Sequence, residues 1–397
     1  MINGVQVYQL REHSKFPCSH TVHKNLIRAQ LLACFRWTGD KILQEWFFCN
    51  TFRVLDKGCQ FLIKEVIEKG PQDAQEIVFR VILFNLFTRI ETWQLLDKAL
   101  GPLTWATYDQ EKYIEVLQDA FRRQIPLYTP GFIKPAPKWE PRPNYVNHLL
   151  FLESLMSTEV DTRLPVASYM ADAFEYFFSM ESLGPFSAYQ LLLNLSYSKV
   201  LNFHPNDFVM SGPGSLSGLR KIFGKSWKSS NKEYGFHESV MRYMVDSQAF
   251  HFRRLGLEFS GLGPKKLPMD IADIEHTLCE VDKYCRIKHP EIKSGRTNVT
   301  RRFNAAPNTP AVNPAVLPKA WSHRARRTPK IRPTPVSPDK DKRYLIDFIR
   351  DHKVEDGETF YRVHWLGYPD RDDTWEAEDI LMHDAPAAVQ YYLDEIN

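Results

Sequence analysis

One apolar stretch near residue 80 constrains the fold more than any other part of the chain. Within residues 77–87 every position except Arg80 and Asn85 is a branched aliphatic residue, leucine or phenylalanine. Wound into a helix, this stretch is apolar nearly all round, which is typical of a central, buried helix. The pattern predicts a long helix over residues 72–100, closed by Gly101 and Pro102.

Helical periodicity continues through the first 290 residues, and no clear alternating strand precedes residue 340. Apolar residues recur at helical spacing from Ile42 to Ile67, and Lys69-Gly70-Pro71 is expected to end that helix. A proline-rich loop is predicted over 126–143. Further helices are predicted over residues 109–124, 145–156, 166–180, 187–197, 234–255 and 271–286. We therefore expect a mostly α domain over residues 20–293, after an extension of residues 1–19.

The 397 residues suggest two or three domains. The six cysteines form no Cys-x-x-Cys pair and lack structural-zinc spacing, so we interpret them as reduced, mostly buried thiols of an intracellular protein. We expect no metal and no cofactor. No run suits a signal peptide or a membrane span. The cysteines are Cys18, Cys34, Cys49, Cys59, Cys279 and Cys285.

Charge divides the last hundred residues into two parts. Residues 294–338 hold nine Arg or Lys, eight Pro and no Asp or Glu, which predicts a disordered basic linker over 294–340. The basic cluster within residues 324–332 of this linker could bind nucleic-acid phosphate, act as a nuclear-import signal, or be only a solvated part of the linker. Residues 341–397 hold fifteen acidic and six basic residues, which suits a basic partner. The candidate DNA-binding residues of the cluster are Arg324, Arg326, Arg327 and Lys330, with Arg332 beside them.

Residues 341–397 are predicted to form a small α+β module. Strands are expected over 343–350, 359–365 and 373–376, with a hairpin turn at Glu355-Asp356-Gly357 and a closing helix over 385–396. The segment resembles the chromodomain family along its whole length. The stretches that carry the resemblance are Tyr344-Leu345-Ile346-Asp347, Tyr361-Arg362-Val363-His364-Trp365-Leu366-Gly367-Tyr368 and Asp373-Thr374-Trp375-Glu376.

The chromodomain resemblance implies a methyl-lysine reader. In that family three aromatic residues enclose a methylammonium group, and the matching positions are Tyr344, Trp365 and Tyr368. Cation–π attraction suits a quaternary ammonium, which has no hydrogen-bond donors. A histone peptide would be added as a strand, with Glu376 and Asp372 near the cage and the peptide. We interpret Trp375 as a structural residue, and Ile380 departs from the asparagine common in the heterochromatin-protein branch.

A second motif lies between two predicted helices, at Met180 to Ala188. It resembles a helix-hairpin-helix turn, which directs backbone N–H groups toward a DNA phosphate, with Ser182, Gly184 and Pro185 as the contact positions. Glycosylases of that superfamily place a catalytic aspartate at a distance that matches Asp207, where it assists departure of a flipped base. Asp207 could instead cap a helix. No lysine stands in the hairpin, so we expect no Schiff-base chemistry.

The helical domain as a whole resembles the helical domain associated with 5-hydroxymethyldeoxyuridine DNA kinases and with thymine pyrophosphorylases. Asn50 and Arg53 are expected on one helix face, binding either DNA or an internal ion-pair network. Gly212 and Gly214 could cradle a phosphate. No P-loop is found, so we expect no kinase domain. The stretches that carry the resemblance are residues 42–45, 48–56, 84–87, 91–93, 126–129, 180–195, 211–214 and 273–280.

These patterns together predict a nuclear, chromatin-associated protein with a mostly α domain, a basic linker and a chromodomain. We expect a methylated histone tail and DNA as partners, and no membrane. One alternative is a base-modifying or glycosylase-like enzyme targeted to chromatin. Another is a mobile-element-derived chromodomain protein without catalysis. The oligomeric state and the question of catalysis stay open at this point.

Overall fold

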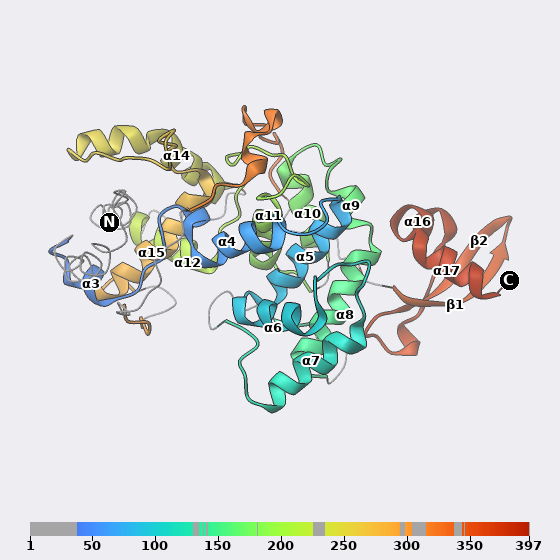
Figure 1. The fold of residues 1–397 in the computed structure, drawn as a ribbon. Coiled ribbons are helices and arrows are strands. Elements are labelled where there is room, and N and C mark those ends of the chain that lie inside the picture. Colours follow the sequence, from blue (N-terminus) through green and yellow to red (C-terminus); the bar gives the residue numbers. More distant parts are fainter. Residues whose placement is uncertain are drawn as a thin grey trace. The chain divides into compact units, whose positions relative to one another are not determined.

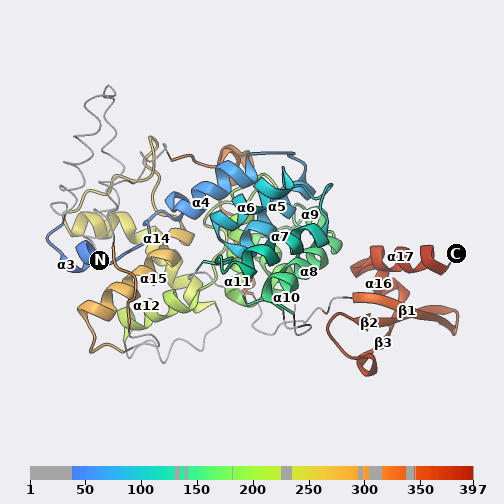
Figure 2. The same ribbon diagram turned by 60° about the horizontal axis from the view of Figure 1, so that its bottom comes forward.

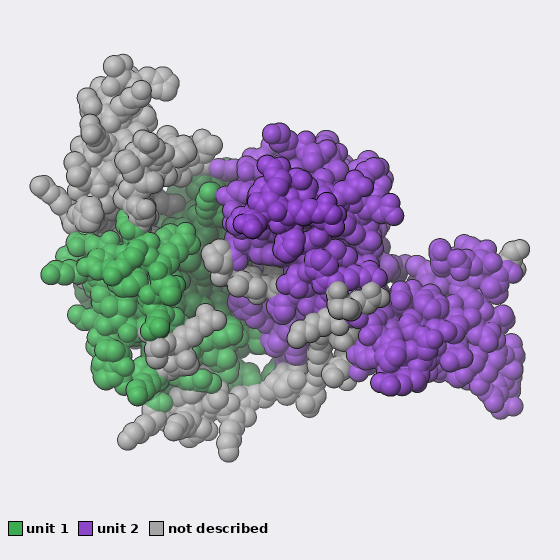
Figure 3. All heavy atoms as spheres, turned by 90° about the horizontal axis from the view of Figure 1, so that it is seen from below, with its two compact units in different colours: residues 1–60, 204–317, 328–335 green, residues 61–203, 318–327, 336–397 purple. Residues whose placement is uncertain are grey.

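A computed structural model gives the fold (Figure 1). It describes residues 38–129, 135–137, 139, 142–180, 182–224, 235–293, 298–303, 315–336, 344 and 346–396. The predicted extension over residues 1–19, which includes Cys18, lies outside these residues, and so do residues 20–37, which include Cys34. The chain divides into two compact units, coloured separately in Figure 3. Unit 1 comprises residues 1–60, 204–317 and 328–335, and unit 2 comprises residues 61–203, 318–327 and 336–397.

The centre of unit 2 is helix α5 (Ala74–Phe87), which begins where the Asp73 carboxylate accepts the backbone N–H of Glu76. Every residue from Glu76 to Phe87 is buried, as the sequence predicts for a central helix. Figures 1 and 2 show α5 among the other helices of this unit. These are α6 (Ile90–Leu100), α7 (Gln110–Arg122), α8 (Asn144–Ser157), α9 (Val160–Arg163), α10 (Met170–Ser179) and α11 (Pro185–Leu195).

The single helix expected over residues 72–100 is wrong, because it divides at Thr88. Thr88 adopts a left-handed conformation with φ of 53°, and Arg89 is extended. The Thr88 hydroxyl lies 2.8 Å from the carbonyl of Phe87 and 2.7 Å from the hydroxyl of Thr129. The break therefore relies on a contact with a distant residue and not on a local glycine or proline.

Unit 1 is built on α15 (Ile271–Lys288), which packs against α12 (Pro213–Phe223), α14 (Phe236–Arg254) and α3 (Lys41–Glu45). The helix expected from Ile42 to Ile67 is also wrong. The chain leaves the helix after Glu45, makes a 3₁₀ turn η2 (Arg53–Leu55), and resumes as α4 (Lys57–Phe61), which runs into a π-helical segment η3 (Leu62–Ile67).

The disordered linker expected over residues 294–340 is wrong for part of its length. Residues 315–336 are described and include two 3₁₀ turns, η4 (Lys319–Ser322) and η5 (Arg324–Arg326). Arg326 and Val336 are buried, at 6% exposure each. Low apolar content did not prevent ordering here, because hydrogen bonds from the buried Arg326 attach residues 318–327 to the rest of unit 2. Residues 294–297, 304–314 and 337–340 lie outside the described residues.

The C-terminal module is a three-stranded antiparallel sheet with strand order β1-β2-β3, as expected. The strands are β1 (Ile346–Glu355), β2 (Glu358–Trp365) and β3 (Thr374–Ala377), with η6 (Asp370–Asp372) before β3. The predicted hairpin turn is present, and Asp356 and Gly357 both have positive φ, at 55° and 85°. The closing helix is α17 (Pro386–Ile396), and an additional helix, α16 (Glu378–Asp384), precedes it. The small core comprises Ile349, Tyr361, Val363, Leu381, Val389 and Tyr392.

No helix among the described residues is both long enough and apolar enough to span a membrane.

Candidate functional site

The structure brings the three predicted cage residues together at one end of the sheet. Tyr344 precedes β1, Trp365 ends β2, and Tyr368 follows β2. The ring centroid of Tyr344 lies 6.0 Å from that of Trp365 and 5.5 Å from that of Tyr368. The ring planes meet at 62° and 83°, so the Tyr344 ring stands steeply against each of the other two. Tyr344 is 41% exposed, so part of this residue is open to solvent.

A hydrogen-bond relay orients the Trp365 ring from the neighbouring strand. The indole N–H donates to the Thr374 hydroxyl at 2.9 Å, and that hydroxyl donates to the Glu376 carboxylate at 2.5 Å. Glu376 therefore supports the cage from β3. Asp372 lies on η6, where its carboxylate is 3.8 Å from Arg371, so the structure does not join it to this relay.

The interpretation of Trp375 as a structural core residue is wrong. Its side chain is 41% exposed and is absent from the core of the module. The Lys353 ammonium lies 4.9 Å from the centroid of its ring. Because β3 alternates its side chains between two faces, Trp375 points away from the face that holds Thr374 and Glu376.

The hairpin residues Ser182, Gly184 and Pro185 connect α10 to α11, as expected. Gly184 is the N-cap of α11, and Pro185 occupies its first position. No heavy atom lies within 4 Å of the Cβ that Gly184 lacks, so its backbone is accessible. Contact between the first-turn N–H groups of this eleven-residue helix and a DNA phosphate stays a prediction.

Asp207 belongs to unit 1, whereas the hairpin belongs to unit 2. Asp207 is 4% exposed, and its carboxylate accepts the backbone N–H of His204 at 2.8 Å and that of Lys330 at 2.6 Å. Burial raises the pKa of this carboxyl, although the two N–H groups oppose the shift. Both oxygens are therefore engaged by backbone, a geometry that favours a structural role.

Asn50 and Arg53 do not share a helix face, because residues 46–52 are not helical. Asn50 donates from both its backbone N–H and its side-chain amide to one oxygen of Asp56, at 3.1 and 2.9 Å. The backbone N–H of Arg53 donates to Asp273 at 2.8 Å, and the Arg53 side chain is buried. The structure favours the internal-network alternative for these two residues.

The segment expected to cradle a phosphate is the start of α12. The Gly212 N–H donates to the buried carboxylate of Glu275 at 3.0 Å, which occupies the position that an anion would take. A Cβ on Gly214 would lie 2.8 Å from the Cys279 sulfur, so this glycine permits close packing of α12 on α15. The geometry argues against a phosphate site at Gly212 and Gly214.

The basic cluster separates into one buried and three exposed residues. Arg326 donates from one guanidinium nitrogen to the carbonyls of Ser196 at 2.7 Å and Ser198 at 3.1 Å, and also to that of Leu201. These carbonyls follow the C-terminus of α11, where a cation is favourable. The remaining residues, Arg324, Arg327 and Lys330, are exposed.

Replacing Arg326 by methionine is expected to destabilise unit 2 by about 3 kcal/mol, because buried carbonyls would lose charged donors. The free energy of unfolding in urea, followed by circular dichroism, measures this loss. The matched control is Arg324→Met, which changes an exposed arginine two residues away and should have little effect on stability. Equal effects of the two substitutions would contradict the structural role of Arg326.

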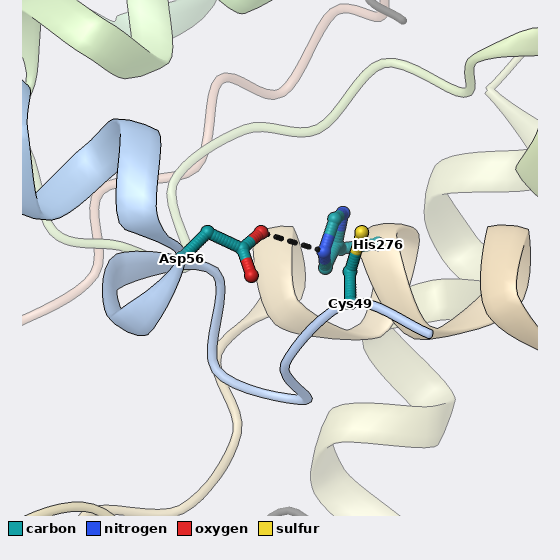
Figure 4. Close-up of side chains that lie close together, drawn as sticks. All are labelled: Cys49, Asp56 and His276. Carbon is teal, nitrogen blue, oxygen red and sulfur yellow. Dashed lines mark ion pairs between the residues drawn. The ribbon is translucent and has the colours of Figure 1, made fainter. Parts of the chain in front are cut away.

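A partly buried polar cluster that the sequence did not predict as a site lies in unit 1 (Figure 4). Cys49 and Asp56 come from the segment between α3 and α4, and His276 comes from α15. One potential ligand atom from each lies within 4.8 Å of the other two. Asp56 Oδ2 is 3.2 Å from His276 Nε2, although the direction of the N–H does not meet hydrogen-bond geometry.

The electrostatics of the cluster follow from this proximity. Burial alone would lower the pKa of His276, but the Asp56 carboxylate and the Cys49 thiol hold it well above its usual value. Burial would raise the pKa of Asp56, and His276 reverses that shift so that the net pKa is lowered. Burial raises the pKa of the Cys49 thiol. Two of the stretches used for the family resemblance, residues 48–56 and 273–280, thus meet here.

Comparison with known proteins agrees with both parts of the architecture. The family described as "5-hmdU DNA kinase, helical domain" matches residues 20–294, and the chromo (chromatin organisation modifier) domain family matches residues 344–395. No solved structure matches.

Two relatives are similar to this chain, one named for a 5-hmdU DNA kinase and one for a histone-lysine methyltransferase. A 5-hmdU DNA kinase of Bacillus phage SP10 is 23% identical over 269 residues, which are 62% of this chain and 40% of the phage protein. The histone-lysine N-methyltransferase SUV39H2 of Gallus gallus is 33% identical over 54 residues, which are 14% of this chain and 13% of that protein. The chain thus spans less than half the length of either relative. The chain belongs to the 5-hmdU DNA kinase helical-domain family and carries a chromodomain at residues 344–395.

Proposed function

We propose that this protein associates with chromatin in the nucleus by reading methylated lysine on a histone tail. The observation that carries the proposal is the steep packing of Tyr344 against Trp365 and Tyr368, at 62° and 83°. Aromatic faces arranged in this way attract a methylammonium group by cation–π interaction and require no hydrogen-bond donor from it. The relative SUV39H2, a histone-lysine methyltransferase, matches the same module.

The rest of the module supports a basic peptide as the ligand. Residues 341–397 carry fifteen acidic and six basic residues, a net charge of −9 from 6 minus 15. In the sheet, β1 and β3 are the outer strands, so an extended peptide has an edge to join by backbone hydrogen bonds. Electrostatic attraction would bring a histone tail to this edge, and the cage would select the methylated side chain.

The experiment uses the full chain and, for each histone-tail lysine tested, a peptide series in which that lysine carries zero, one, two or three methyl groups. We expect the affinity, measured by calorimetry, to rise with methylation, because each methyl group removes a hydrated N–H and adds apolar contact. Affinity that is independent of methylation across all histone lysines tested would exclude a reader function.

We further propose that the helical domain engages DNA, including a modified base. Three features support this: family membership, the accessible N-terminus of α11 behind Gly184 and Pro185, and the exposed basic residues Arg324, Arg327 and Lys330. Basic side chains on an exposed segment release counterions when they neutralise phosphates, which gives affinity with little sequence preference.

Replacing Arg324, Arg327 and Lys330 together by alanine is expected to weaken duplex binding and to reduce the slope of log K against log salt by about 3, roughly one for each phosphate that is no longer neutralised. Fluorescence anisotropy with a labelled duplex at several salt concentrations measures the slope. The matched control replaces the exposed lysines Lys265 and Lys266, which lie elsewhere in the sequence. A slope unchanged in the triple variant would show that the cluster does not contact DNA.

An enzymatic version of this function depends on Asp207. Its buried carboxylate accepts two backbone N–H groups, so the geometry favours the version in which the domain only binds. Incubation with duplexes that contain thymine or 5-hydroxymethyluracil, followed by mass spectrometry of nucleosides, decides between the versions. Product that disappears in an Asp207→Asn variant would establish catalysis, whereas no change at protein concentrations that bind DNA would leave a binding domain.

A further inference from the structure

We propose that Cys49, Asp56 and His276 form a binding site for a divalent metal ion of the zinc class. Two of the side chains come from one segment and the third from a helix more than 200 positions further along the chain, and they converge on one point (Figure 4). Asp56 Oδ2 and His276 Nε2 are 3.2 Å apart. Two ligands that are about 2.0 Å from a tetrahedral ion are separated by about 3.3 Å, so this pair already has the required spacing.

Surrounding groups hold the ligands in position. Asn50 donates twice to Oδ1 of Asp56, at 3.1 and 2.9 Å, which leaves Oδ2 directed at His276. The Cys49 backbone N–H donates to Glu280 at 3.1 Å, which anchors the thiol-bearing residue to α15. His276 projects from the eighteen-residue α15 itself. Hydrogen bonds of this kind, behind the ligands, are a regular feature of metal sites and tune their affinity.

The burial of His276 also supports a bound group. His276 is 4% exposed, and its buried Nε2 lies at ion-pair distance, 3.2 Å, from Asp56 Oδ2 without hydrogen-bond geometry to it. A metal ion between Nε2, the Asp56 oxygen and the Cys49 sulfur would satisfy all three atoms together.

The set of donors selects the ion. A cysteine sulfur and an imidazole favour Zn²⁺ or Co²⁺, whereas Mg²⁺ and Ca²⁺ prefer oxygen ligands throughout. Three protein ligands leave a fourth tetrahedral position for water or for a bound molecule, as in catalytic rather than structural zinc sites. The site therefore offers the helical domain a Lewis acid that a histidine–carboxylate pair alone would not supply.

A similar trio in the chromodomain provides a contrast. His364, Asp370 and Asp373 also lie close together, but Asp373 Oδ2 is 3.2 Å from Arg350 Nε and 3.4 Å from Arg362 Nε. Two guanidinium groups already neutralise that carboxylate, so an added cation would be repelled. We propose no metal there.

The test uses the full chain, stripped of metal with a chelator and then titrated with Co²⁺. We expect one equivalent of cobalt to produce thiolate-to-cobalt charge-transfer absorption that Zn²⁺ abolishes by displacement. Cys49→Ser should remove this absorption, and Asp56→Asn, which keeps the shape of the side chain, should weaken cobalt binding at least about tenfold. Cys285→Ser, which changes another cysteine that α15 itself carries, is the matched control and should retain the absorption.

The wild-type titration alone can overturn the proposal, whatever the folding of the variants. Absence of a thiolate–cobalt signal in folded wild-type protein would leave an internal ion pair as the role of the cluster. A signal that persists undiminished in folded Cys49→Ser would place the metal elsewhere. Neither outcome affects peptide binding by the chromodomain, so this test is separate from that of the reader function.

Discussion

Replacing Trp365 by alanine is expected to weaken binding of a trimethyl-lysine histone peptide by roughly 30-fold or more. The loss reflects a desolvated cation–π contact of about 2 kcal/mol. Trp365 packs steeply against Tyr344 and is oriented by a hydrogen bond to Thr374. Its removal therefore also leaves the Tyr344 ring without this support. Calorimetry with the full chain measures the change, and binding of the unmethylated peptide should change much less.

Trp375→Ala is the matched control for this substitution. It removes the same side chain from a position ten residues along, where the ring is 41% exposed and contacts Lys353 instead of the cage. We expect its affinity for the methylated peptide to stay within about twofold of the wild type, as for a surface substitution. Equal loss in both variants would indicate general destabilisation of the module, and no loss in either would refute the cage.

The chromodomain could be predicted in detail because its signals are local. The hairpin turn at Asp356 and Gly357 and the strands beside it lie within a short stretch of consecutive residues. The cage positions came from the family resemblance instead. What the sequence did not indicate was α16, a short helix that depends on packing against β2 and β3. Trp375 was misplaced because an aromatic residue in a short strand does not reveal which face of the sheet is buried.

The helical domain shows where local patterns stop being sufficient. The central position of α5 follows from composition alone, because a helix that is apolar all round can only be buried. The break at Thr88 does not follow from composition, since a threonine with positive φ is disfavoured locally and is stabilised here by the surrounding structure. The same holds for residues 46–52, where apolar spacing suggested a helix and contacts with α15 hold a non-helical segment instead.

The cluster of Cys49, Asp56 and His276 was beyond prediction for a different reason. Rules for metal ligands depend on short spacings, whereas Cys49 and His276 are separated by most of the domain and meet only after folding. The one available signal was that residues 48–56 and 273–280 both belong to the family resemblance. Two distant stretches with a shared resemblance are candidates for contact, and here they do lie together.

Replacing Gly218 by alanine is expected to destabilise unit 1 by about 3 kcal/mol, the upper end for overpacking of a well-filled interior. A Cβ at this position would lie 2.3 Å from the carbonyl oxygen of Leu278, which belongs to the backbone of α15 and cannot rotate away. The free energy of unfolding in urea measures the effect. Gly58→Ala, in α4, is the matched control, because no atom lies within 4 Å of its added Cβ. In a helix, alanine is more favourable than glycine by about 1 kcal/mol.

Alanine substitutions also distinguish two roles for the glycines of α12. If the segment at Gly212 and Gly214 bound phosphate, Gly214→Ala would lower duplex affinity and leave the free energy of unfolding unchanged. If the glycines allow α12 to approach α15, Gly214→Ala and Gly218→Ala should both lower stability, with the larger loss at Gly218, where the clash is with backbone rather than with the Cys279 side chain. The second outcome is expected, because Glu275 already accepts the N–H that a phosphate would need.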